Sequence, residues 1–225
     1  QLLVETDDGT RSVPLPDVSE VALYGPVSIT TPALTELMRR QVPVSWHTSG
    51  GWLVGRTVGT GTAGVETRAA QFAAAEDPAA CRRIAAGLVA AKIRNQRTLL
   101  RRNDKSDGDA GREAALARLS RLVESVPRAD GPERLLGIEG EAAAIYFSRF
   151  DRMIAPTRGL GAHFSFERRN RRPPADPVNA MLSFAYALAT RLFTGALAAA
   201  GFDPGQGFFH RPRPGRPALA LDMME

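Results

Sequence analysis

The sequence predicts an α+β protein in which a small N-terminal β domain with one helix is followed by a mainly α-helical domain. Residues 1–59 hold short segments with the composition of strands, separated by turn residues. Residues 65–225 are rich in alanine and carry apolar residues at helical spacing. The stretch GTGTAG at 59–64 has few side chains to bury and is typical of a linker. We therefore assign residues 1–62 and 63–225 to two domains.

The strand-like segments of the first domain alternate with turns. The first two, LLVET and RSVPL, flank the turn sequence DDGT and are expected to pair as a hairpin. The strand candidates are, in chain order, residues 2–6, 11–15, 18–25, 42–48 and 51–59.

One helix is expected inside the β domain, in TTPALTELMRRQ at residues 30–41. Thr31 is the expected cap and Pro32 the first helical residue, a position where proline costs no hydrogen bond. Leu34 and Leu37 follow at helical spacing and predict a buried face.

The second domain reads as a series of helices separated by short breakers. The polar stretch NDKSDGDAG and the proline-rich RRPPADP are the clearest interruptions. The helices are expected at 65–76, 79–102, 111–126, 131–151 and 177–200, with a last one beginning near Arg216.

The charge of the chain favours phosphate as a partner. The formal net charge is +5 with a pI near 10.1, and Lys92 and Lys105 are the only lysines, so the positive charge is almost all arginine. A guanidinium pairs with two phosphate oxygens at once, which suits nucleic acid. Arginine richness also follows from GC-rich coding DNA, so composition alone leaves both readings open.

Cysteine content and hydropathy narrow the class of protein further. Cys81 is the only cysteine, which excludes an internal disulfide, a cysteine-rich zinc site or an iron–sulfur cluster built from this segment alone. No signal peptide is recognisable, and no uninterrupted apolar run approaches the ~20 residues of a membrane span. We expect a soluble protein of a reducing cytoplasm, with no membrane partner.

The first candidate for chemistry is LLGIEGEAAAIYFSRF at 135–150, where Glu139 stands between two glycines in an otherwise apolar helix. A carboxylate there is well placed for a helix N-terminus and is a candidate for chemistry. The alternative is that Glu139 or Glu141 complements the helix dipole. We interpret Glu141, two residues along, as a surface residue because it points to another face.

The second candidate is GFDPGQGFFHRPRPGRPALALDMME at 201–225, which contains His210, Asp222 and Glu225. Asp222 and Glu225 share a helix face because they are three residues apart. Two acids and one histidine make a mostly oxygen-donor site suited to magnesium or manganese, as phosphodiester chemistry requires. The alternative for His210 is a partly buried histidine with its hydrogen bonds satisfied.

Two basic segments are predicted to contact DNA phosphates. One is the arginine cluster in FERRNRRPPADPVNA, where prolines stiffen the turn, and the other is the helix expected at 79–102. The alternative for both is a solvated run of charge. The candidate residues are Lys92, Arg94, Arg97, Arg168, Arg169, Arg171 and Arg172.

Taken in this order, the segments resemble the CRISPR-associated protein 1 family along essentially the whole chain. The matching motifs are GIEG with AA and YF after it, RRPPADPVNA with LS, and the final GR, LALD and ME. AAKIRNQRTLLRR at 90–102 and the N-terminal strands are also similar.

The resemblance implies that Glu139, His210 and Glu225 ligate one Mg²⁺ or Mn²⁺ ion and are catalytic, with Asp222 adjacent in the catalytic set. It implies a metal-dependent DNA endonuclease and integrase, in which the 3′-hydroxyl of captured DNA attacks a phosphodiester at the end of a CRISPR repeat. The helical domain would then be catalytic, with its C-terminal end missing, and the β domain would mediate dimerisation.

The resemblance also implies partners. These are prespacer and repeat DNA, a second copy of the chain, and a dimer of CRISPR-associated protein 2 that bridges two such dimers, in a prokaryotic cytoplasm. Some relatives carry a fused CRISPR-associated protein 4 domain, and only such a domain would add an iron–sulfur cluster. The alternative function is a non-catalytic DNA-binding or assembly subunit, which predicts a replaced ligand, whereas all three acids and the histidine are present.

Overall fold

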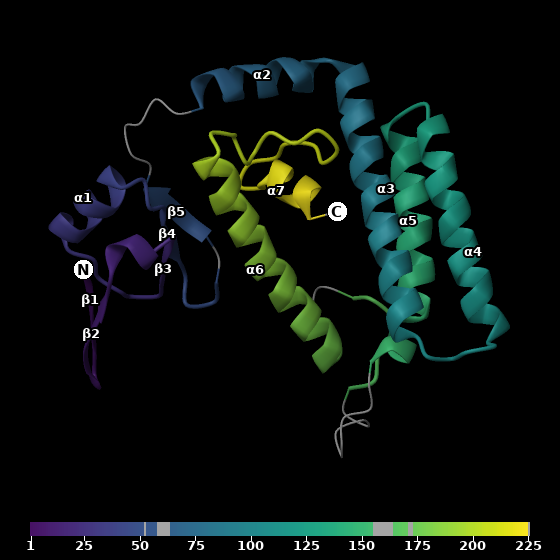
Figure 1. Cartoon of the computed structure of the whole chain (residues 1–225), viewed down its shortest axis with the longest axis horizontal. Helices are drawn as coiled ribbons and strands as arrows, with labels where there is room; N and C mark the ends of the chain where they lie inside the picture. The colour runs from purple at the N-terminus through teal and green to yellow at the C-terminus, as the bar shows by residue number, and fades with distance from the viewer. Residues whose placement is uncertain (52, 58–63, 155–163, 171–172, 225) are drawn as a thin grey trace. The chain divides into compact units, whose positions relative to one another are not determined.

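The computed structural model describes residues 1–51, 53–57, 64–154, 164–170 and 173–224 (Figure 1). The chain forms two compact units. The first comprises Gln1–Thr67 and Gly195–Phe202, and the second comprises Arg68–Thr194 and Asp203–Glu225. The small β region followed by a mostly helical region confirms the predicted α+β class. Residues 58–63, where we predicted the linker and the domain boundary, lie outside the described residues.

The first unit contains two small sheets. Strands β1 (Leu2–Thr6) and β2 (Gly9–Val13) form the predicted antiparallel hairpin. Strand β4 (Val44–His47) is the centre of the other sheet, parallel to β3 (Val21–Tyr24) and antiparallel to β5 (Leu53–Thr57). A short 3-10 helix at Leu15–Asp17 follows the hairpin.

Helix α1 (Thr31–Arg39) connects the parallel strands β3 and β4, as a parallel pair requires a crossover. Its cap is Thr30 rather than Thr31, because the Thr30 hydroxyl accepts the N–H of Ala33 at 3.4 Å. The prediction was wrong by one residue because both positions carry threonine and can cap equally well. Leu37 is fully buried, as its spacing predicts.

Three long helices form the core of the second unit. Figure 1 shows α3 (Pro78–Asn103), α4 (Ala110–Ser125) and α5 (Pro132–Ser148) side by side as an antiparallel bundle. Helix α2 (Val65–Glu76) leads into α3, whose first turn is capped by Asp77. A 3-10 turn at Val126–Arg128 joins α4 to the segment before α5.

The apolar faces of these three helices meet in one cluster of buried residues. Ile93, Leu119 and Leu135 are completely buried there, each contributing about 1.5–3 kcal/mol through burial. Phe209, from the segment before the last helix, belongs to the same cluster. The cluster therefore fixes the segment around residue 209 against the bundle.

The remaining helices are α6 (Pro177–Ala199) and α7 (Ala218–Met223), and a 3-10 turn at Phe150–Met153 follows α5. Among the described residues, α6 is long and apolar enough to cross a membrane, with a mean hydropathy of 1.3 over an 18-residue window. The sequence pattern does not predict α6 as a membrane span, because Asn179 and Ser183 interrupt its apolar residues. One such helix is weak evidence for a membrane span.

A buried ion-pair network closes the end of the bundle. Both Nε and Nη2 of Arg149 donate to Oδ2 of the fully buried Asp104, at 2.9 and 2.7 Å. Arg149 also reaches Asp109, which caps α4, and the Ser106 hydroxyl bonds Asp104. Burial alone would raise the pKa of Asp104, but the hydrogen bonds from Ser106 and Arg149 outweigh it and hold the pKa below its usual value.

We predict that Asp104→Asn lowers the free energy of unfolding by about 3 kcal/mol, because Arg149 loses its buried anionic partner. The matched control is Asp107→Asn, whose side chain is 88% exposed and whose loss leaves stability nearly unchanged. Urea denaturation followed by circular dichroism measures both. Equal stability of the two variants would contradict the role of the network.

The same pair predicts a pH dependence. Since the folded pKa of Asp104 lies below 3.8, its stabilising contribution is complete above 3.8 and is lost as the pH falls through the lower folded value. Denaturation of the wild type at falling pH should show this loss. Asp104→Asn should show less of it, and an identical acid dependence would count against the assignment.

Candidate functional site

The carboxylate of Asp222 in α7 organises the segment that carries His210. Its Oδ2 accepts the backbone N–H groups of Phe208 and Phe209 at 2.6 and 3.0 Å. Its Oδ1 accepts the N–H of His210 at 2.8 Å and lies 2.8 Å from Nδ1 of the same residue. Asp222 is fully buried, so these contacts take the place of water around its charge.

This arrangement fixes how the imidazole of His210 can act. Because Nδ1 faces Asp222, Nε2 is the ring nitrogen left to bind a ligand, and the side chain is 22% exposed. A carboxylate behind a histidine is the usual arrangement at metal sites, where it sets the tautomer and the ring orientation. Asp222 therefore orients His210 through Nδ1, and its predicted membership of the catalytic set stays a prediction.

Gly207 is required by the close approach of the segment to Asp222. A Cβ at this position would lie 2.7 Å from the carbonyl oxygen of His210 and 2.9 Å from Oδ2 of Asp222. A larger residue would therefore push apart the atoms that position His210.

Gln71 in α2 anchors the start of the same segment. Its Nε2 donates to the carbonyl oxygens of Asp203 and Gln206 at 2.8 and 2.7 Å, and its Oε1 accepts the N–H of Asp203 at 2.8 Å. Gln71 is 3% exposed. This role could not be predicted from the sequence, because a glutamine in an alanine-rich helix is typical of an exposed surface.

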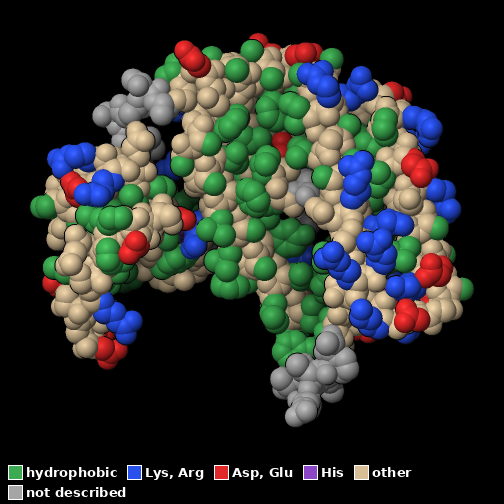
Figure 2. Space-filling model, viewed as in Figure 1, with side chains coloured by type: hydrophobic (Ala, Val, Ile, Leu, Met, Phe, Trp, Pro, Cys, Tyr) green, Lys and Arg blue, Asp and Glu red, His purple; other side chains and the backbone are tan. Residues whose placement is uncertain are grey.

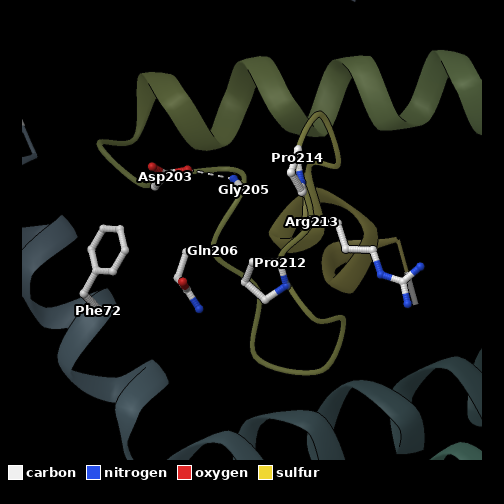
Figure 3. Close-up of a pocket in the computed structure, with 7 residues that line it drawn as sticks. All are labelled: Phe72, Asp203, Gly205, Gln206, Pro212, Arg213 and Pro214. Carbon is white, nitrogen blue, oxygen red and sulfur yellow. Dashed lines mark hydrogen bonds between the residues drawn. The ribbon is translucent and has the colours of Figure 1, made fainter.

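A cavity of about 360 Å³ lies between α2 and this anchored segment. In Figure 3, Phe72 faces Gln206 and Pro212 across the cavity, whereas the guanidinium of Arg213 extends away from Phe72. The lining residues are Phe72, Asp203, Gly205, Gln206, Pro212, Arg213 and Pro214.

Glu139 lies on α5 in contact with α3. The helix begins at Pro132, so Glu139 is about two turns inside it, and the helix-dipole interpretation does not apply beyond the first turn. Its Oε1 is 2.5 Å from Nζ of Lys92, and the two side chains are 21% and 19% exposed. Glu141 points elsewhere, to an exposed ion pair with Arg118.

The core cluster includes a chain neighbour of each described candidate ligand. Ile138 and Phe209, the chain neighbours of Glu139 and His210, belong to the same group of buried residues. Glu225, the third predicted ligand, lies outside the described residues. Among the residues that the structure describes, no group of three or more histidine, cysteine or acidic side chains could hold a metal ion. The donors present, a carboxylate and an imidazole Nε2, fit a divalent ion with open positions.

The predicted DNA-binding residues divide by their contacts. Arg169 donates to Oδ1 of the fully buried Asn179 at 2.8 Å and stacks 5.7 Å from the ring centre of Tyr186. Arg97 donates to the carbonyl oxygen of Leu116 at 3.2 Å. These guanidinium groups, like the ammonium of Lys92, are engaged within the protein.

Arg94 and Arg168 are exposed, and Arg171 and Arg172 lie outside the described residues. Figure 2 shows basic side chains spread over the helical bundle in this view. The exposed arginines of α3 are Arg82, Arg83, Arg94, Arg101 and Arg102. Arg83, Arg94 and Arg101 follow one another at close to whole helical turns, so they form a line along α3.

We predict that Asp222→Asn destabilises the His210 segment by on the order of 3 kcal/mol. The asparagine amide has one oxygen that accepts hydrogen bonds, whereas both oxygens of the carboxylate accept them. The N–H groups of Phe208 and Phe209 would face an NH₂ donor. Asp203→Asn, which affects one backbone contact in the same segment, is the control and should cost less. Thermal denaturation and hydrogen exchange at residues 208–210 measure the effect, and unchanged exchange would contradict it.

Comparison with known proteins identifies the family. The model of the family described as CRISPR associated protein Cas1 matches residues 1–225. A Rhodospirillum rubrum protein named "CRISPR-associated exonuclease Cas4/endonuclease Cas1 fusion" is 53% identical over 218 residues. That match covers 97% of this chain and 37% of the relative, so the chain spans less than half of that protein.

Two solved structures share the fold. A CAS1 protein from Thermotoga maritima has a TM-score of 0.77 at 23% identity, and the match covers 98% of this chain and 67% of that chain. A chain of a Cas6-RT-Cas1–Cas2 complex has a TM-score of 0.74 at 27% identity, covering 99% of this chain and 24% of that one. From the match over its whole length, the chain belongs to the CRISPR-associated protein Cas1 family.

Proposed function

We propose that this chain is part of a divalent-metal-dependent DNA integrase and endonuclease of CRISPR adaptation. The observation that supports it most is the contact of His210 Nδ1 with a buried carboxylate, because Nε2 is then the ring nitrogen that would bind a metal ion. Membership of the Cas1 family and a relative named as a Cas1 endonuclease support the reaction class.

In this proposal Glu139, His210 and Glu225 hold Mg²⁺ or Mn²⁺, and Asp222 positions His210. The ion would supply Lewis-acid polarisation of the scissile phosphoryl oxygen. The contribution of the protein is orientation. Asp222 fixes the imidazole and the bundle core fixes the helix of Glu139, so the ligands do not need to reorganise.

The substrate in this proposal is DNA with a free 3′-hydroxyl, which attacks a phosphodiester at the end of a CRISPR repeat. Hydrolysis of DNA would use the same ligands with water as the nucleophile. The exposed Arg94 and Arg168 would bind phosphates and align the strand. Because Arg97 and Arg169 are engaged within the protein, we assign them the role of shaping that surface.

The proposed partners extend beyond this chain. The R. rubrum relative is named as a fusion with Cas4, and the solved complex contains Cas2 by its title. We propose that this protein also forms dimers, that a Cas2 dimer bridges two of them, and that a Cas4 domain can be attached. Its proposed location is the prokaryotic cytoplasm.

Removal of any one proposed ligand tests the catalytic role. We predict that Glu139→Gln, His210→Ala and Glu225→Gln each lower strand transfer by more than about a hundredfold, since loss of a residue behind a ligand already costs 10–100-fold. DNA binding should survive because arginine contacts do not need the metal. Strand transfer into a repeat-containing plasmid is the assay, with Glu141→Gln as the control. Normal activity of the ligand variants would favour a non-catalytic assembly subunit.

The DNA surface is tested separately. We predict that Arg94→Gln and Arg168→Gln weaken DNA binding regardless of sequence and reduce the slope of log K against log salt by about 0.9 for each lost phosphate contact. Arg39→Gln, at a 72% exposed side chain in α1, should leave the slope unchanged. The measurement is DNA affinity at several salt concentrations, which gives the slope for each variant. An unaltered slope would mean that the two arginines are only a solvated face.

A further inference from the structure

Lys92 contacts the one proposed metal ligand that the bundle itself supplies. Its Nζ on α3 lies 2.5 Å from Oε1 of Glu139 on α5. The side chains are 19% and 21% exposed, so solvent screens their attraction less than it screens a surface pair. One oxygen of the carboxylate is therefore already occupied by a positive charge.

A second ion pair on α5 offers a direct comparison. Arg118 Nε on α4 lies 2.5 Å from Oε1 of Glu141, and these side chains are 47% and 42% exposed. Both pairs join α5 to a neighbouring helix of the bundle over the same distance. They differ in burial and in that only the Lys92 pair includes a proposed ligand.

We propose that Lys92 is a built-in counter-cation for Glu139, which holds this carboxylate in place without metal and lowers the affinity of the site for a divalent ion. The inference rests on the proposed function, because it takes Glu139 as a ligand. An ammonium group on the carboxylate neutralises part of its charge and repels a dication that approaches the other oxygen. Lys92 thus positions a ligand and tunes metal binding, in addition to its predicted role with DNA.

The test compares metal binding by full-length variants. Lys92→Met keeps the apolar stem and removes the charge, Lys92→Arg keeps the charge, and Arg118→Met removes the exposed pair on the same helix. Mn²⁺ binding is measured from the electron paramagnetic resonance signal of the free ion. We expect Lys92→Met to tighten Mn²⁺ binding roughly threefold or more, the factor that corresponds to an ordinary ion pair. Lys92→Arg and Arg118→Met should bind as the wild type does.

Thermal denaturation supplies a second readout. Lys92→Met should melt at a lower temperature than the wild type without metal, and saturating Mn²⁺ should remove most of this difference, because the ion then neutralises Glu139. A difference that persists unchanged in Mn²⁺, or Mn²⁺ binding that is unchanged or weaker in Lys92→Met, overturns the proposal.

The failure of this inference can be distinguished from failure of the proposed site by Glu139→Gln. If Glu139→Gln loses Mn²⁺ binding while Lys92→Met binds as the wild type does, the site stands and the role of Lys92 is wrong. If Glu139→Gln binds Mn²⁺ normally, the ligand assignment itself is wrong, and the role of Lys92 is overturned with it.

Discussion

The candidate site depends on one buried carboxylate. Asp222 accepts three successive backbone N–H groups and lies against Nδ1 of His210, so a single side chain determines both the path of the segment and the orientation of the imidazole. Leaving such a charge without partners would cost several kcal/mol. The segment is therefore stable only in the conformation that satisfies Asp222, and this conformation leaves Nε2 available.

Two ion pairs of the helical bundle differ in how far their side chains are buried, and we infer different roles for them. Arg149 and the fully buried Asp104 are joined by two hydrogen bonds, with further contacts to Ser106 and Asp109, and this network closes the end of the bundle. Lys92 and Glu139 keep about a fifth of their side-chain surfaces exposed. This partial exposure is what the proposed response of the second pair to a metal ion requires, whereas Asp104 in the first pair is fully buried.

Much of the fold follows from local pattern. Helix α2 was predicted at its observed bounds, and α3 to α6 within three residues, because alanine-rich helical spacing bounded by glycine, proline and aspartate is a local signal. The last helix begins at Ala218 rather than near Arg216, because Arg216 takes part in a bridge with Arg213 and Pro217 precedes the first turn.

The residue types of the candidate site remain a prediction from the sequence, and few of their contacts could be predicted. The motifs around Glu139 and His210 indicated ligands, but Lys92 and Glu139 are 47 positions apart, and Gln71 and Asp203 are 132 apart. Contacts between residues so far apart in the sequence arise from tertiary packing, so neither the periodicity nor the composition of the sequence predicts them. The same holds for Arg97 and Arg169, whose hydrogen bonds within the protein cannot be read from a basic run.

The proposed site is defined by the atoms that would face the metal ion. Crystals of the full-length protein grown with Mn²⁺ would locate the ion directly through its anomalous scattering. We expect one peak in contact with Nε2 of His210 and the carboxylate of Glu139, while Asp222 remains on Nδ1. A peak bound by Asp222 itself, or one distant from His210, would contradict it.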